Sequence, residues 1–232
     1  MKLLKRRPRN NNRRTVQLIA HSNPKLPITE QYRQIRTNIQ FSSVDKEIKS
    51  IMVTSPEPGD GKSTTAANLA IVLAQQGKSV LLVDTDLRRP SVHYAFNISN
   101  LNGLTRVLTR DINLEDAICK TYVHNLEILT CGPIPPNPSE LLSSKAMDNV
   151  MEELNGKFDI VVYDTPPVLA VTDPQILANK CDGVVMVVAS GKTLKDHAIK
   201  AKELLESAKC RLIGVVLNGI ETSKRAYYKE YK

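Results

Sequence analysis

The residues with the clearest chemistry form a glycine-rich turn that ends in a lysine and two hydroxyls. An apolar stretch at residues 50–54 leads into Pro56-Glu57-Pro58-Gly59-Asp60-Gly61-Lys62-Ser63-Thr64, and a helix-forming, alanine-rich stretch follows. Glycines let backbone N–H groups converge on phosphate oxygens, and a helix N-terminus adds positive potential. Lys62 can reach the terminal phosphates of a nucleotide, and the Ser63 hydroxyl can hold Mg²⁺. The pattern predicts a P-loop that binds ATP and Mg²⁺ through Gly59, Asp60, Gly61, Lys62, Ser63 and Thr64.

This turn departs from the general P-loop pattern at one position. The first glycine of G-x-x-x-x-G-K-[ST] is replaced by Pro56. A chance Gly-Lys-Ser in a surface turn is the alternative interpretation. That alternative does not explain the apolar stretch before the turn and the helical stretch after it, which together are the context a P-loop requires.

Aspartates end two further apolar runs. Asp84 and Asp86 follow residues 81–83, and Asp164 follows residues 160–163. In an open α/β sheet, ligands bind beyond the carboxyl ends of the strands. If these strands neighbour the strand before the P-loop, the three carboxylates meet at the phosphates. There they could bind Mg²⁺ together with Ser63, and one could accept a proton from a hydroxyl nucleophile. A strand-end carboxylate in a turn is the alternative for each, but it is weak for two sites beside a P-loop.

Short β-branched runs alternate with helical patterns along the chain. Strands are predicted at residues 50–54, 79–84, 126–130, 159–164, 183–189 and 211–218. Helices are predicted at residues 29–39, 62–76, 145–154, 173–179 and 195–208, with a broken helical region over 104–118. Strands without alternation are buried on both faces, and strand–helix alternation gives a parallel sheet. We expect an α/β, P-loop NTPase-like fold, with a mostly parallel central sheet and helices on both faces.

The charge of the chain is concentrated at one end. Of the formal charge of +8, seven Lys and Arg side chains lie within residues 1–14, and without them +1 remains. We expect a basic flexible arm at residues 1–27, one domain at 28–220 and a flexible tail at 221–232. Such an arm suits an anionic membrane surface, nucleic acid or an acidic partner, or it is simply a solvated tail.

The sequence gives no indication of a membrane-spanning, secreted, zinc-binding or redox-active protein. The 232 residues, 41% of them hydrophobic, are enough to bury a core. No stretch approaches the ~20 apolar residues that span a bilayer, and the basic N-terminus lacks the apolar region of a secretory signal. The four cysteines form no C-x-x-C pair, so neither a zinc site nor a redox motif is predicted. Reduced cysteines in a cytosolic protein are expected.

The last twelve residues differ from the body of the chain. They lack core-forming periodicity, and three of the seven tyrosines, Tyr227, Tyr228 and Tyr231, fall within the last six positions. Packing of these rings against the body is one interpretation. The charged residues beside them favour a solvent-exposed phosphoacceptor.

These motifs together resemble the bacterial tyrosine kinases (BY-kinases) of Gram-positive capsule and exopolysaccharide systems. The Walker A, A′ and B motifs of that family are matched by residues 59–64, 84–90 and 163–167. Its E-x-x-R-x-x-R helix, used in ring assembly, is matched by Glu30, Arg33 and Arg36, although this spacing also describes an ordinary exposed helix face. A proline-rich stretch at 132–141 is family-like, and the resemblance extends from about Glu30 to the tail.

The resemblance implies an ATP-dependent protein-tyrosine kinase that phosphorylates its own tail tyrosines in trans and regulates capsule or exopolysaccharide synthesis and export. It implies Lys62, Asp84, Asp86 and Asp164 as the catalytic set, with Asp84 or Asp86 as the base, and Asn218 as a reader of the nucleotide base. Implied partners are a membrane-embedded activator of the chain-length-determinant type, other copies of the chain in a ring, a cognate phosphotyrosine phosphatase and protein substrates, but no nucleic acid. The expected location is cytoplasmic, at the inner face of the membrane.

Two other functions share these features. Partitioning and cell-division (ParA/MinD-like) ATPases have similar aspartate motifs and use ATP to switch dimerisation. Their P-loop carries a signature lysine five residues before the invariant one, where this chain has Glu57. A nucleotide-gated adaptor without catalysis is the third interpretation, and only an assay separates it from a slow kinase.

Arg88 and Arg89 could contact phosphate or phosphotyrosine, or could be solvated or pair with a neighbouring subunit.

Overall fold

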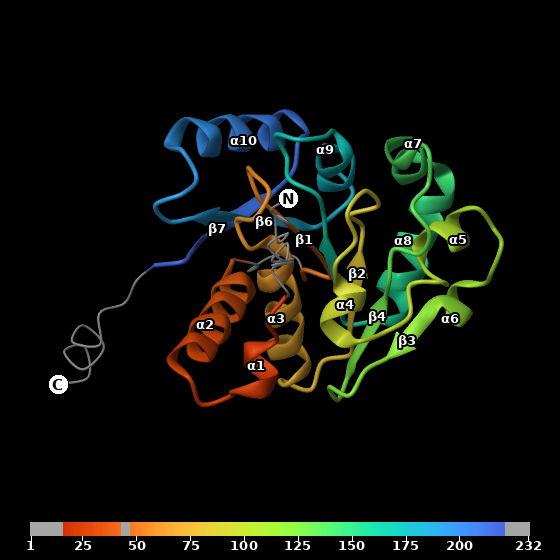
Figure 1. Ribbon diagram of the computed structural model, residues 1–232, viewed down its shortest axis with the longest axis horizontal. Coiled ribbons are helices and arrows are strands. Elements are labelled where there is room, and N and C mark those ends of the chain that lie inside the picture. The colour runs from red at the N-terminus through yellow and green to blue at the C-terminus, as the bar shows by residue number, and fades with distance from the viewer. Residues whose placement is uncertain (1–15, 43–46, 221–232) are drawn as a thin grey trace, which may run out of the picture.

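The computed structural model describes residues 16–42 and 47–220, which form a seven-stranded sheet between two layers of helices (Figure 1). The strand order is β3-β4-β2-β5-β1-β6-β7, and all neighbours are parallel except β3 and β4. The strands are β1 (Ser50–Thr54), β2 (Val80–Asp84), β3 (Ile118–Lys120), β4 (Leu126–Leu129), β5 (Ile160–Asp164), β6 (Gly183–Ala189) and β7 (Leu212–Asn218). The predicted mostly parallel α/β sheet is confirmed.

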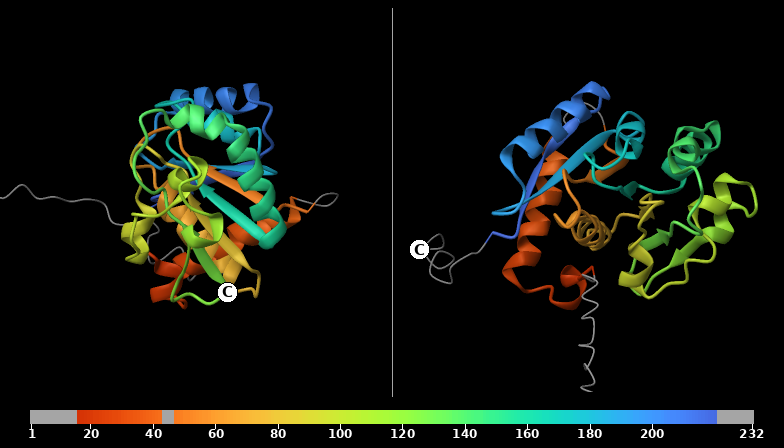
Figure 2. Two further views of the ribbon diagram at one scale, coloured as in Figure 1. Left: turned by 90° about the vertical axis from the view of Figure 1, so that its right-hand side faces the viewer. Right: turned by 45° about the horizontal axis from the view of Figure 1, so that its top comes forward.

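The helices divide between the two faces of the sheet (Figure 2). One hydrophobic core includes residues of α1 (Ile19–Ser22), α2 (Pro27–Phe41), α3 (Lys62–Ala74) and α4 (Val92–Phe96). The core of the opposite face includes residues of α5 (Leu104–Leu108), α6 (Leu114–Ala117), α7 (Pro138–Ser143), α8 (Lys145–Lys157), α9 (Asp173–Ala178) and α10 (Lys195–Ser207). Because both faces are covered, every residue of β1, β2 and β5 is buried, as a non-alternating apolar pattern predicts.

Strand register sets the positions of the acidic residues. In the β2–β5 pairing Asp84 lies opposite Asp164, and in the β1–β5 pairing Val53 lies opposite Asp164. The carboxyl end of β1 then leads directly into the glycine-rich turn and α3. The sheet therefore brings both aspartate motifs and the turn to the same edge, as the ligand-binding position of an open α/β sheet requires.

The segment before α2 belongs to the folded part of the chain. The sequence places residues 1–27 in a flexible arm, whereas Gln17 and α1 lie against α3. Ala20 is fully buried, and its N–H donates to Asn68 Oδ1 at 2.9 Å. Asn68 Nδ2 in turn donates to the Gln17 carbonyl at 2.7 Å. The four residues of α1 are too few to show a helical periodicity in the sequence. Their position depends instead on these hydrogen bonds to α3.

The helical region at 104–118 is broken, as predicted, but its last residue already belongs to a strand. It forms two short helices, α5 and α6, and the edge strand β3 begins at Ile118. β3 pairs antiparallel with β4 through three residues only. A strand this short is specified by its pairing partner rather than by its own pattern.

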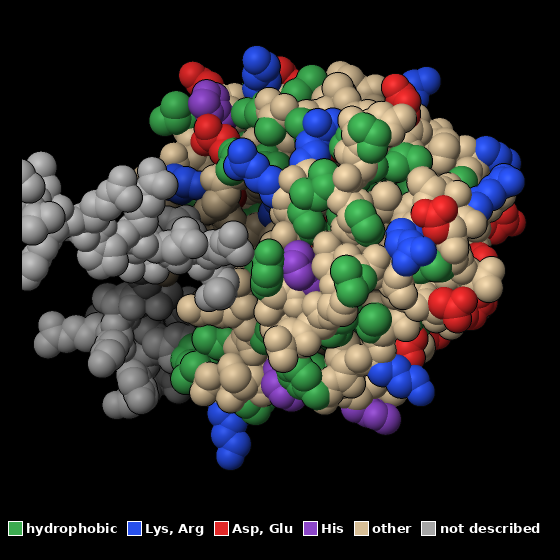
Figure 3. All heavy atoms as spheres, turned by 45° about the vertical axis from the view of Figure 1, so that its right-hand side comes forward, with side chains coloured by type: hydrophobic (Ala, Val, Ile, Leu, Met, Phe, Trp, Pro, Cys, Tyr) green, Lys and Arg blue, Asp and Glu red, His purple; other side chains and the backbone are tan. Residues whose placement is uncertain are grey.

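Several large apolar side chains of the described residues are exposed at the surface. Figure 3 shows hydrophobic side chains scattered among polar and charged ones over the face it displays. Exposed examples include Leu101, Ile134 and Tyr122. Among the described residues, no helix combines the length and the apolar character that crossing a bilayer requires.

Candidate functional site

The glycine-rich turn between β1 and α3 has the backbone conformation that its glycines permit. Gly59 and Gly61 have φ angles of 81° and 101°, a region that side chains disfavour. Gly61 is the N-cap of α3. A Cβ at Gly61 would lie 2.1 Å from Asn218 Nδ2, so this position also lacks space for a side chain. The turn thus presents its N–H groups and the α3 N-terminus to whatever binds above it.

A cavity of about 720 Å³ opens above this turn. Its floor includes Gly59, Gly61, Lys62, Ser63 and Thr64, and another part of its lining comes from Asp86, Arg88 and Arg89. Much of the remaining wall is proline, from Pro135, Pro136, Pro166 and Pro167. A polar, cationic floor below apolar walls fits an anionic ligand that also carries a ring or another apolar part.

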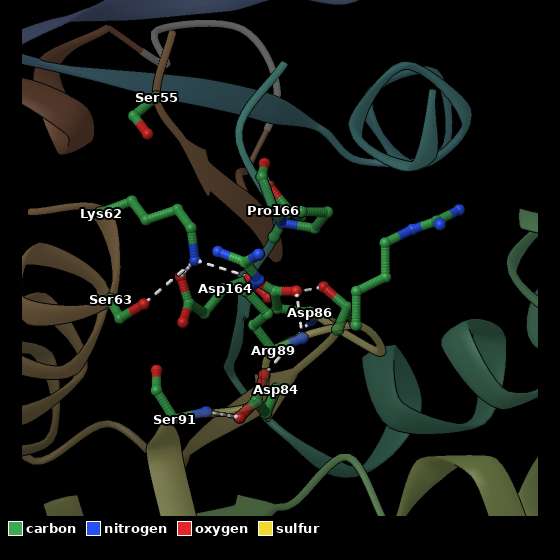
Figure 4. A network of polar contacts seen from close by, with 12 residues as sticks. Ser55, Lys62, Ser63, Asp84, Asp86, Arg89, Ser91, Asp164 and Pro166 are labelled. Atoms are coloured by element: carbon green, nitrogen blue, oxygen red, sulfur yellow. Dashed lines mark hydrogen bonds and ion pairs between the residues drawn. The ribbon is translucent and has the colours of Figure 1, made fainter. Parts of the chain in front are cut away.

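Lys62 lies at the centre of the polar groups (Figure 4). Its Nζ donates to Ser63 Oγ at 3.1 Å and to Asp86 Oδ2 at 3.1 Å, and lies 3.5 Å from Asp164 Oδ1. Burial lowers the pKa of Lys62, but the Asp164, Asp86 and Asp84 carboxylates together raise it above its usual value. Lys62 therefore stays charged although its side chain is almost completely buried.

Asp84 is held by the backbone around it. Its Oδ1 accepts the Asp86 N–H at 3.2 Å, and its Oδ2 accepts the N–H groups of Ser91 at 2.9 Å and Val92 at 3.0 Å. It therefore joins the end of β2 to the start of α4. Complete burial and the neighbouring Asp164 raise the pKa of Asp84 to about 7.

Asp164 is equally buried but has fewer partners. No hydrogen-bond donor of the described residues meets either of its carboxylate oxygens with good geometry, and Lys62 Nζ is its ion-pair partner. Burial raises the pKa of Asp164, and Lys62 opposes that rise. A buried carboxylate with unused lone pairs is rare unless a cation or ordered water completes it.

These groups fit Mg²⁺ bound together with phosphates. Among the described residues, no group of three or more acidic, histidine or cysteine side chains is arranged to hold a metal unaided. Mg²⁺ does not need such a cage, because it keeps several waters and takes one or two carboxylates plus substrate phosphates. Ser63 Oγ and the open Asp164 carboxylate are oxygen donors of that kind.

The two arginines after Asp86 have different surroundings. Arg88 Nε donates to Asp173 Oδ2 at 2.8 Å, and its Nη2 donates to Asp173 Oδ1 at 3.1 Å and to Ser139 Oγ at 3.1 Å. Arg88 thus clamps the loop after β2 to the first turns of α7 and α9. The backbone N–H of Arg89 donates to Asp86 Oδ1 at 2.9 Å, while its exposed side chain lines the cavity.

The other predicted site residues that the structure describes do not line this cavity. Asn218 Nδ2 donates to the Asp60 carbonyl at 2.9 Å, which places Asn218 at the back of the turn. Glu30 and Arg33 form an ion pair on α2, whereas Arg36 Nη1 donates to the Val72 carbonyl of α3 at 2.8 Å. Tyr227, Tyr228 and Tyr231 lie outside the described residues.

Sequence reasoning missed two groups of this site, Asp173 and Lys192. Asp173 anchors Arg88, and Lys192 Nζ lies 3.1 Å from Asp60 Oδ1. Each pair spans more than 80 positions of sequence, 85 for Arg88 and Asp173 and 132 for Asp60 and Lys192. No local pattern around either residue carries a signal that could have identified the pairing.

Comparison with known proteins gives a consistent result. A family model described as an AAA domain matches residues 48–205. The chain is 54% identical to tyrosine-protein kinase YwqD of Bacillus subtilis, over 92% of this chain and 90% of that one. The crystal structure of the chimerical protein CapA2B2 superimposes with a TM-score of 0.86 at 45% identity, covering 90% and 93% of the two chains. The kinase domain of Escherichia coli tyrosine kinase ETK gives 0.85 at 31% identity, covering 94% and 88%.

Cell-division ATPases share the fold at lower similarity. The septum site-determining protein MinD from Pyrococcus horikoshii, solved with Mg-ADP, has a TM-score of 0.65 at 28% identity and covers 76% of this chain and 72% of its own. The P-loop NTPase type of the fold is thereby confirmed. The higher similarity and coverage of the tyrosine kinases favour them over the switch ATPases.

Proposed function

Since this chain belongs to the bacterial tyrosine kinases and is a protein-tyrosine kinase, we propose that it transfers the γ-phosphate of Mg·ATP to tyrosines in the tail of a neighbouring copy. The observation that carries this proposal is the placement of Lys62 on the cavity floor. There it contacts Ser63 Oγ and two carboxylates, Asp86 from the loop after β2 and Asp164 from the end of β5. Phosphoryl transfer needs charge neutralisation and an aligned acceptor, and little else.

The chain's own groups divide this work. When ATP binds, Lys62 exchanges its contacts with the carboxylates for contacts with the β- and γ-phosphates. The N–H groups of the turn bind the other phosphate oxygens. Asp86 accepts the phenol proton as the tyrosine oxygen bonds to phosphorus and the bond to the ADP oxygen breaks. A phenol with a pKa near 10 gains from such a base.

The choice of Asp86 as base is supported by its surroundings. Of the three carboxylates, Asp86 lines the cavity. Asp84 already accepts three backbone N–H bonds, which suits an anchor rather than a base. Asp164 keeps open oxygens and, with Ser63, would hold Mg²⁺ directly or through water. When bound, Mg²⁺ would neutralise charge that develops on the phosphates.

The acceptors and partners extend this proposal. Tyr227, Tyr228 and Tyr231 are the acceptors, and Glu30, Arg33 and Arg36 of α2 contribute to self-association into a ring. A membrane-embedded activator of the chain-length-determinant type brings the chain to the inner face of the membrane, and a cognate phosphatase removes the phosphate. The cycle regulates capsule or exopolysaccharide synthesis and export.

A mixing experiment tests transfer between copies. One variant, Lys62→Met, keeps the tail and lacks the site. The other, with Tyr227, Tyr228 and Tyr231 changed to Phe, keeps the site and lacks the acceptors. Both are treated with phosphatase, mixed with Mg·ATP with and without a soluble activator fragment, and mapped by mass spectrometry. We expect phosphate on the tail of the Lys62→Met chain. Phosphorylation by the wild type but none in the mixture would contradict transfer in trans.

A further inference from the structure

The turn after β6 lies against the back of the P-loop. Residues 190–194 connect β6 to α10, and Gly191 has a φ of 68°. The Ala189 carbonyl accepts the N–H groups of Lys192 at 3.2 Å and Thr193 at 3.0 Å, and Thr193 Oγ1 accepts the Ala189 N–H at 3.0 Å. These bonds fix the backbone of the turn, so the Lys192 side chain starts from a defined position.

Lys192 reaches the P-loop at two acceptors. Its Nζ donates to the Pro58 carbonyl at 2.8 Å and to Asp60 Oδ1 at 3.1 Å. Asp60 is fully buried, and its Oδ2 accepts the Glu57 N–H at 2.9 Å, which closes the bend of residues 57–60 from inside. The same residue's carbonyl accepts Asn218 Nδ2 from the end of β7. Asp60 is therefore the point where the P-loop, the turn after β6 and β7 are joined.

The negative charge of Asp60 is unfavourable beside a phosphate-binding loop, and Lys192 neutralises it. Asp60 lies two residues before Lys62, in the loop whose N–H groups face the phosphates. A buried carboxylate without a cation would repel a triphosphate across a short, poorly screened distance. Among the described residues, Lys192 makes the one ion pair in which Asp60 takes part. Its own side chain is 44% exposed, so it approaches from the solvent side and leaves the cavity open.

We infer that Lys192 is a positioning residue of the nucleotide site, which neutralises Asp60 and holds the P-loop bend in its phosphate-binding shape. Lys192 does not line the cavity, so it acts on the nucleotide through Asp60 and Pro58 rather than by contact. The same region of the chain makes a second contact with the P-loop bend: His197 Nδ1 of α10 lies 3.1 Å from Glu57 Oε1. The inference rests on the proposed function, since it concerns the same Mg·ATP site.

A double-mutant cycle tests it. Binding of Mg·ATP is measured by calorimetry on the full chain for the wild type, Lys192→Met, Lys192→Arg, Asp60→Asn and the double variant Lys192→Met/Asp60→Asn. We expect Lys192→Met to weaken binding about tenfold and Lys192→Arg to retain most of the affinity. Asp60→Asn should restore most of the loss in the Lys192→Met background, because the carboxylate that needed a cation is gone. The matched control is Lys200→Met, an exposed lysine of α10.

Kinetics separate positioning from general damage to the fold. For Lys192→Met, we expect the KM for ATP in phosphotyrosine formation to rise about tenfold and kcat at saturating ATP to fall much less. Unchanged affinity in Lys192→Met would overturn the inference. An equal loss of Mg·ATP affinity in Lys192→Met and in Lys192→Met/Asp60→Asn would also overturn it, because Lys192 would then not act through Asp60. A wild-type chain that fails to bind Mg·ATP would overturn the proposed function itself, and this inference with it.

Discussion

Lys62 keeps its charge in a largely buried position because carboxylates lie beside it. Asp86 and Asp164 approach its Nζ to 3.1 and 3.5 Å, and its side chain is only 11% exposed. Removing one partner of such a buried pair costs more than removing a surface pair, since the other charge is left uncompensated. The three aspartates differ in their remaining bonds, and those bonds give each one a separate expected role.

Replacement of Asp86 tests its role as the base. Asp86→Asn removes the proton acceptor while keeping an oxygen that can accept the Arg89 N–H. We expect kcat for phosphotyrosine formation to fall by about 10²–10⁴-fold, with a much smaller change in ATP affinity. Quench-flow kinetics at saturating Mg·ATP measure this. Asp116→Asn, at an exposed position, is the control. A kcat within threefold of wild type would remove Asp86 from this role.

The raised pKa of Asp84 predicts a pH-dependent stability. Its usual pKa is 3.8, and burial together with Asp164 raises it to about 7 in the folded chain. Between these values the folded chain holds a proton that the unfolded chain has lost. The stabilising contribution of Asp84 is therefore complete below about pH 4 and is lost as the pH rises through 7.

Asp84→Asn removes this titration. Any loss of stability from the substitution that does not depend on pH leaves the change with pH unaffected. From pH 5 to pH 8, we expect the unfolding free energy of the wild type to fall relative to the variant by about 2–3 kcal/mol. Urea denaturation without nucleotide measures both proteins at each pH. A difference that stays constant, or that changes in the opposite direction, would contradict the raised pKa.

At the scale of elements, loops at the carboxyl ends of the strands carry the site, and contacts between distant elements hold these loops. The loop after β2 is fixed on one side by Asp84 and on the other by Arg88, which bonds both oxygens of the buried Asp173. Ser139 Oγ donates to the same carboxylate at 2.6 Å. Burial raises the pKa of Asp173, but the bonds from Arg88 and Ser139 hold it below its usual value.

Loss of the Arg88 clamp should destabilise the domain. Arg88→Met leaves the Asp173 carboxylate buried with Ser139 as its remaining side-chain donor. We expect the unfolding free energy to fall by about 1–3 kcal/mol. The comparison is Arg106→Met, which breaks a surface pair with Asp111 and an exposed hydrogen bond to Asn102 Oδ1, and which should cost under about 1 kcal/mol. Equal stability of the two variants would show that Arg88 contributes no more than a surface charge.

The elements also show what the sequence could and could not predict. The predicted strands at 50–54 and 183–189 coincide with β1 and β6, because buried β-branched runs between turn signals are a strong local pattern. The motifs at the ends of β1, β2 and β5 could be placed together, since parallel strands align their carboxyl ends. α1 and β3 could not be predicted, because α3 and β4 hold them in place. The pairings of Arg88 with Asp173 and of Lys192 with Asp60 depend on the completed fold.

At the scale of the whole molecule, α2 presents both an outer and an inner set of charges. Glu30 and Arg33 have side chains 59% and 30% exposed and form a pair within the helix. Arg36 instead donates to the Val72 carbonyl in the last turn of α3, where a cation also complements the helix dipole. Arg33 Nη2 also donates to the Pro24 carbonyl at 3.1 Å, but that bond is exposed, whereas the bond from Arg36 is partly buried.

Substitutions along α2 should separate assembly from stability. We expect Glu30→Ala/Arg33→Ala to lower the mass of the assembled species in light scattering while the melting temperature stays within about 2 °C. Arg36→Ala should also lower the unfolding free energy by about 1–2 kcal/mol, because the α3 carbonyl loses its donor. An unchanged mass for the first variant would argue against a ring contact through these residues. An unchanged stability for the second would argue against the contact with α3.

The central claim is that ATP turnover by this chain places phosphate on tyrosine. The most direct measurement is the ratio of phosphotyrosine to ADP formed in the first turnover. It is made on phosphatase-treated protein with Mg·ATP and a soluble activator fragment, alongside Lys62→Met. A ratio near one, with both products lost in Lys62→Met, is the expected result. ADP without phosphotyrosine would contradict the claim and favour a switch ATPase on the same fold.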